Sequence, residues 1–83
     1  MNYNYTVFLK QDEGVKSLIK WQMGEHGGFF TALWKAISTA DLHNQELLSK
    51  GFPLHIKAYR RYATEGGWWE NLLNELRTPE VRG

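Results

Sequence analysis

The sequence contains no cysteine, which excludes disulfide bridges and metal sites with thiolate ligands. It also lacks any apolar stretch near the roughly 20 residues that a membrane-spanning helix needs. The first residues do not show the basic segment followed by an apolar segment that is typical of a signal peptide. From these absences we expect a cytoplasmic protein with no membrane partner.

The sequence also lacks a strong excess of positive or negative charge. The chain has 10 lysine and arginine residues against 9 aspartate and glutamate residues, and its formal net charge is +1 at pH 7. Proteins that bind nucleic acids non-specifically usually carry a larger excess of positive charge. The balance therefore favours a protein partner, with nucleic acid as the second choice.

Aromatic residues, by contrast, are abundant, with four each of tryptophan, tyrosine and phenylalanine in 83 residues. A chain of this length forms one domain, here residues 1–83, and a domain so small buries only about 60–65% of its unfolded surface. Because each aromatic ring can bury roughly 150–250 Å², the rings compensate for the small core.

The spacing of apolar residues predicts an all-α fold, a single small bundle of four to five short helices. Asp12 and Asp41 are placed to cap helix starts, and Pro53 suits the first position of a helix. We expect the helical core to span residues 12–77. The expected helices are 12–23, 29–40, 41–50, 53–64 and 68–77.

Residues 29–40 form the most apolar of these segments, with apolar side chains over an arc of roughly 200°. A helix of this kind normally has neighbours on two or more sides, so we expect it at the centre of the bundle. Its three alanines, Ala32, Ala36 and Ala40, would allow other helices to approach closely.

The two ends of the chain are expected outside this bundle. Residues 1–11 are predicted to be an extended arm, and a short strand at 3–9 is the alternative because apolar and polar residues alternate there. Residues 78–83 follow the last helix and are predicted to be a frayed tail.

Glycine marks three of the expected helix boundaries. Gly51 precedes Phe52 and Pro53 and is predicted to end a helix in the left-handed conformation. The segments 27–30 and 66–69 each join a glycine pair to two large aromatic residues, which we expect to be buried anchors in the first turn of a helix. Shared helix-start chemistry explains this repeat more simply than an internal duplication.

Catalytic and metal-binding patterns are lacking. None of the serines lies in a glycine-flanked elbow, and no two histidines have the spacing that places metal ligands on one helix face. The glycine pairs do not match a phosphate-binding motif. We therefore expect no enzymatic activity, no metal and no cofactor.

The best candidate for a contact surface is a basic face on the helix at 53–64, formed by Lys57, Arg60 and Arg61. Such a face can bind acidic side chains or phosphates, and Trp21 and Trp68 are candidate apolar anchors beside it. The alternative interpretation is a solvated face whose arginines pair with Glu65 or with an acid of a neighbouring helix.

The segment from residue 28 to residue 69 resembles small uncharacterised proteins encoded by bacteriophages and prophages. The shared pattern places a Gly-x-Phe start and an Asp-x-x-Asn turn around the central helix, then Gly-Phe-Pro, then Gly-Trp-Trp. The departure from it is that residues 29 and 30 are both aromatic. The resemblance implies a phage or prophage setting and supplies no activity. The residues that carry it are Gly28, Phe30, Trp34, Ala36, Ile37, Ala40, Asp41, Asn44, Leu48, Gly51, Phe52, Pro53, Gly67, Trp68 and Trp69.

Together these features predict a small, non-enzymatic protein-binding module, encoded by a phage and acting on a host protein in the host cytoplasm. One alternative is a nucleic-acid-binding protein that uses the basic helix 53–64. A second alternative is a self-associating structural protein, a homo-oligomer that buries surplus apolar surface against its own copies.

Overall fold

The computed structural model describes residues 3–79, and over that range the chain forms six α-helices and no strand. The all-α fold is therefore confirmed. The helices are α1 Tyr5–Leu9, α2 Glu13–Gln22, α3 Gly28–Thr39, α4 Leu42–Gly51, α5 Pro53–Thr64 and α6 Trp68–Arg77.

Local side-chain chemistry sets most of the helix starts. The carboxylates of Asp12 and Asp41 each accept a backbone N–H three residues further on, both at 2.8 Å, and Pro53 is the first residue of α5. The predicted left-handed end at Gly51 is wrong, because Gly51 is the last helical residue of α4 and the chain leaves the helix at Phe52 instead.

The predicted extended arm at 1–11 and the strand at 3–9 are also wrong where the structure describes them, because Tyr5–Leu9 is helix α1. Asn4 explains the difference. Its side-chain oxygen accepts the N–H of Val7, while its backbone N–H donates to the carbonyl of Leu76 at 2.6 Å and its side-chain amide donates to the carbonyl of Thr78. The contacts of Asn4 with α6 thus stabilise a helix in a segment whose alternating apolar and polar residues favoured a strand. Residues 80–83 of the predicted tail lie outside the described residues.

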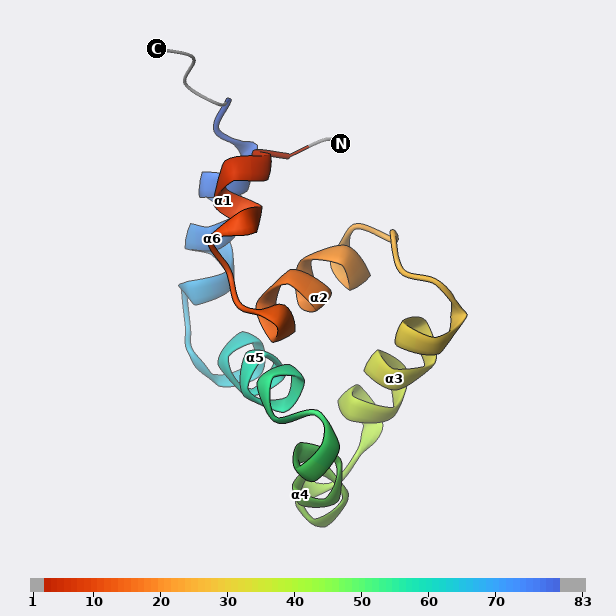
Figure 1. Cartoon of the computed structure of the whole chain (residues 1–83). Coiled ribbons are helices and arrows are strands. Elements are labelled where there is room, and N and C mark those ends of the chain that lie inside the picture. Colours follow the sequence, from red (N-terminus) through yellow and green to blue (C-terminus); the bar gives the residue numbers. More distant parts are fainter. Residues whose placement is uncertain (1–2, 80–83) are drawn as a thin grey trace.

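Helix α2 lies at the centre of the molecule, in contact with α1, α3 and α5 (Figure 1). The first and last helices, α1 and α6, pack side by side at one end, and α3 and α4 lie at the other. The crossing of α2 and α5 is close because Gly14 has no side chain and sits against the backbone of Leu54. The expectation that residues 29–40 form the centre is therefore wrong, since α3 lies at an edge of the fold.

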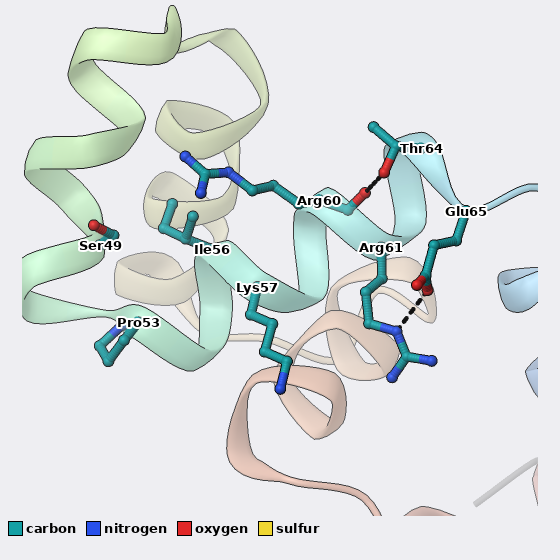
Figure 2. Close-up of a pocket in the computed structure, with 8 residues that line it drawn as sticks. All are labelled: Ser49, Pro53, Ile56, Lys57, Arg60, Arg61, Thr64 and Glu65. Carbon is teal, nitrogen blue, oxygen red and sulfur yellow. Dashed lines mark hydrogen bonds and ion pairs between the residues drawn. The ribbon is translucent and has the colours of Figure 1, made fainter.

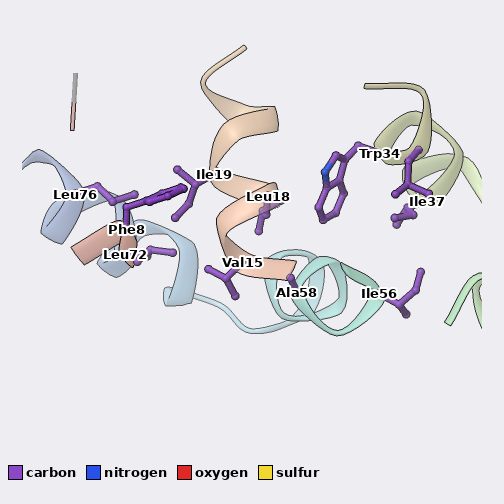
Figure 3. Close-up of a cluster of buried hydrophobic side chains, with 11 residues drawn as sticks. Phe8, Val15, Leu18, Ile19, Trp34, Ile37, Ile56, Ala58, Leu72 and Leu76 are labelled. Carbon is purple, nitrogen blue, oxygen red and sulfur yellow. The ribbon is translucent and has the colours of Figure 1, made fainter. Parts of the chain in front are cut away.

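The buried side chains form a strip that follows α2 (Figure 3). Phe8, Leu72 and Leu76 occupy the end where α1 meets α6, and Trp34 and Ile37 occupy the end where α3 packs. Trp34 and Ile37 are completely buried, so the side of α3 that carries them is part of the core although α3 is not central.

The molecule is thin, with principal extents of 47 × 28 × 17 Å. Large apolar side chains consequently remain at the surface. They include Phe29 and Phe30, which are 65% and 36% exposed and are therefore not the buried anchors expected from the glycine-aromatic segment. None of the helices between residues 3 and 79 is long and apolar enough to cross a membrane.

Candidate functional site

The basic face of α5 borders an open groove with a volume of about 390 Å³ (Figure 2). Tyr59 and Tyr62 pack against the core, as the helical pattern predicts, and this orientation leaves the basic side chains at the surface. Pro53 is exposed and supplies apolar surface to the groove, whereas Ile56 is buried and contributes almost none. Its lining residues are Ser49, Pro53, Ile56, Lys57, Arg60, Arg61, Thr64 and Glu65.

Arg60 turns away from the other two cations and reaches across to α4 (Figure 2). Its guanidinium forms an ion pair with Glu46 at 2.8 Å, and its Nε donates to the side-chain oxygen of Gln45 at 3.4 Å. Both charged side chains of this pair are well exposed to solvent, and ion pairs of that kind contribute only about 0–1 kcal/mol.

Arg61 and Trp68 form a unit beside the groove. The Arg61 guanidinium lies over the indole ring of Trp68, 4.4 Å from its centroid, and its Nε donates to the carboxylate of Glu65 at 2.7 Å. Lys57, one helical turn earlier, has no ion-pair partner among residues 3–79 and points to the same side as Arg61 (Figure 2). The structure thus brings three of the five predicted residues, Lys57, Arg61 and Trp68, to one surface, and places Arg60 at the α4 side of the same groove.

Trp21 is the predicted residue that the structure places elsewhere. Its ring stacks on Trp34 with the centroids 5.3 Å apart and the planes within 7° of parallel. The contact joins α2 to α3, so Trp21 belongs to the packing between those helices and is half-buried.

A second cluster, which the sequence does not predict, joins two histidines through one phenylalanine. The ring of Phe30 stacks on His26 at 5.0 Å and on His55 at 5.9 Å between centroids. The three residues come from the α2–α3 loop, from α3 and from α5, so no spacing in the sequence could reveal the cluster. Burial lowers the pKa of His26 and the pKa of His55, because each ring loses contact with water.

His26 also contacts Ser17, a pairing that superficially resembles a nucleophile and its base. Its Nε2 lies 2.8 Å from the Ser17 hydroxyl and 2.7 Å from the Ser17 carbonyl oxygen. Because a carbonyl oxygen can only accept, this hydrogen-bond pattern assigns the proton to Nε2, which then cannot accept the serine proton. The Ser17 hydroxyl also accepts the indole N–H of Trp34 at 2.9 Å. The network therefore satisfies buried polar groups at the α2–α3 contact.

The histidine cluster borders a groove of about 290 Å³ along α2, opposite side chains of α1. Lys20 lies at this groove and holds its ammonium 5.9 Å from the centroid of the Phe8 ring. Within the described part of the chain, no three histidine or acidic residues are grouped in a way that could hold a metal ion.

No protein-family model, curated protein or solved structure matches this chain. A function must therefore be argued from the chemistry of its surfaces. The α5 groove combines an exposed apolar residue, a lysine that forms no ion pair with residues 3–79 and an arginine held on an indole ring.

Proposed function

We propose that the protein is a non-enzymatic binding module that holds an acidic segment of a partner protein in the α5 groove. The observation that carries the proposal is the arrangement of Arg61 on Trp68, with Lys57 one turn earlier on the same side of α5 and the exposed Pro53 among the residues that line the same groove. Arginine and tryptophan dominate the energetics of protein interfaces because each combines a large contact area with directed polar contacts.

The charges of the groove favour a carboxylate-bearing partner. Lys57 can receive a carboxylate without losing an existing ion pair. The ion pairs of Arg60 and Arg61 are partly exposed, so their glutamates can give way to, or share the guanidinium with, a carboxylate of the partner. The stack on Trp68 restricts Arg61 beforehand, which lowers the entropy lost on binding.

The same charges favour a protein over a nucleic acid. Glu46 and Glu65 pair with two of the cations of the groove, whereas an acidic protein segment can be held through a single carboxylate at Lys57. A phosphate-binding surface gains most of its affinity from uncompensated cations, and here two of the three cations are compensated. The resemblance to small phage and prophage proteins favours a host protein as the partner.

The test is a quantitative pull-down from host-cell lysate with immobilised wild-type chain and the variant Arg60→Glu plus Arg61→Glu. The matched control is Lys10→Glu plus Lys35→Glu, which changes the net charge equally at exposed positions outside the groove. We expect a partner that wild type and control retain and that the groove variant loses by at least about tenfold, equivalent to about 1.4 kcal/mol. Thermal melts of all three chains verify folding.

Equal capture of every partner by the groove variant and by wild type would show that this surface assignment is wrong. Electrophoretic mobility of labelled nucleic acid tests the alternative. Retardation that weakens steeply as the salt concentration rises, and that the same two arginines control, would assign the groove to nucleic acid instead.

A further inference from the structure

We infer that the uncovered side of α3 forms the interface of a symmetric homodimer. Four apolar residues, here called the α3 stripe, follow one another along this side: Phe29, Ala32, Ala36 and Ala40. At about 100° per residue their spacing places them on one side of the helix, next to the buried side that carries Trp34 and Ile37. Phe29 is 65% exposed, Ala32 and Ala36 are exposed, and Ala40 is half-buried.

A groove of about 480 Å³ lies at one end of the α3 stripe, between α3 and α4. Small side chains form its α3 wall, and the half-exposed Leu47 adds a large apolar surface from α4. The groove is lined by Ala36, Thr39, Ala40, Asn44, Leu47 and Leu48.

The two ends of the stripe are complementary in shape. Phe29 projects at the start of α3, and the groove lies beside Ala40, eleven residues or roughly 16 Å further along the helix. In an antiparallel pair of α3 helices related by a two-fold axis, Phe29 of each copy meets the groove of the other copy. The alanines between them allow the two helix axes to approach to about 8 Å.

The charge distribution is compatible with a second copy, and the complementarity of Phe29 to the groove favours that occupant. Neither the α3 stripe nor the groove contains an ionisable side chain, so two identical surfaces can meet without repulsion between like charges. Lys35 is the one charged residue of α3, and it lies at the flank of the stripe, three residues from Ala32, where its long side chain can extend into solvent. The acidic partner proposed for the α5 groove would find no cation here, so the two surfaces require different occupants.

The test measures the mass of the full chain in solution by light scattering and sedimentation equilibrium, at protein concentrations up to about 100 μM. We expect a wild-type dimer with a dissociation constant in roughly the micromolar range. Ala36→Glu places two carboxylates near the axis and should yield a monomer. The matched control Ser38→Glu puts the same charge at an exposed position away from the stripe and should leave the dimer intact.

A covalent experiment locates the contact. Because the chain has no cysteine, a single Ala36→Cys substitution introduces the only thiol. Two such thiols lie near the two-fold axis, so a short bismaleimide should join them, while Ser38→Cys should remain unlinked. A monomer throughout the concentration range would overturn the inference. A dimer that survives Ala36→Glu would place the contact on another surface and would overturn it equally.

Discussion

Gly14 is the residue on which the closest helix contact depends. It is buried where α2 crosses α5, and a Cβ at this position would overlap the carbonyl of Leu54. The obstacle is backbone within a helix, which cannot move aside as the end of a flexible side chain can. Glycine is therefore required for close approach here, whereas Gly67 is required for its left-handed conformation, with φ of 86°.

Gly14→Ala should destabilise the protein by about 1–3 kcal/mol or more, because α2 and α5 must separate to admit the methyl group. For a domain of this size that loss lowers the melting temperature by at least about 5 °C. Gly51→Ala is the control, since Gly51 is already helical and an added methyl group meets no atom within 4 Å. Circular dichroism on heating measures both, and equal melting temperatures for Gly14→Ala and wild type would contradict the close contact.

The role of a residue could be predicted from the sequence where its contacts are with residues a few positions away. It could not be predicted where the contacts are with another helix. The caps at Asp12 and Asp41 satisfy backbone amides three positions away, so the local sequence contains all the information. The roles of Gly14 and Ser17 depend on α5 and on Trp34, which the sequence does not place beside them.

At the scale of elements, the histidine cluster connects the α2–α3 loop and α3 to α5. Loss of solvent lowers the pKa of His26 and of His55, and the positive charge of Lys20 adds to this at His26, while Glu25 opposes it. The charge of His26 also lowers the pKa of His55, whereas the carboxylates of Glu13 and Asp12 raise it. Burial in this cluster therefore disfavours the protonated form of both rings.

The stability of the protein should fall as the pH drops below about 6.5, the ordinary pKa of histidine. In that range the unfolded chain takes up protons that the folded chain resists, so protonation favours unfolding. Above about 6.5 both states are neutral and the effect vanishes. Thermal melts between pH ~7.5 and ~5 measure the slope.

His55→Phe keeps an aromatic ring against Phe30 and removes the titration, so its melting temperature should depend less on pH. His43→Gln is the control, because His43 is exposed on α4. An identical slope in wild type and His55→Phe would show that His55 does not contribute.

Helices with strong local signals were predictable as elements, and α1 was not. All six helices begin at a cap, a proline or a glycine, including α1 at Asn4, but only the other five are long enough to show apolar residues at helical spacing. Residues 5–9 form only one to two turns, and a helix so short depends on tertiary contacts, here those with α6. Alternation of residue types then predicts the wrong element, because packing decides the outcome.

For the whole molecule, the thinness of the fold explains the one large error in arrangement. High apolar content in residues 29–40 predicted a central helix, but a molecule only 17 Å thick covers one side of α3 and leaves the other exposed. The candidate site was predicted more fully, because Lys57, Arg60 and Arg61 follow one another on one helix. The position of Trp68 beside Arg61 depends on the turn at Gly67 and could not be predicted.

The α5 groove and the α3 stripe share no residue and should act independently. Ala36→Glu should leave the affinity of each α5 groove for its partner unchanged within about twofold, and Arg60→Glu plus Arg61→Glu should leave the dimer intact. Titration calorimetry and sedimentation of each variant give the two quantities. Loss of partner binding in the monomeric Ala36→Glu chain would show that the surfaces are coupled.

The hydrogen bonds from Asn4 to the carbonyls of Leu76 and Thr78 also constrain how the protein is made. During translation α1 leaves the ribosome before α6, the helix against which it packs, has been synthesised. The nascent chain must therefore carry α1 without its native neighbour until α6 has emerged. That end of the fold therefore closes only after α2 to α5 have been synthesised.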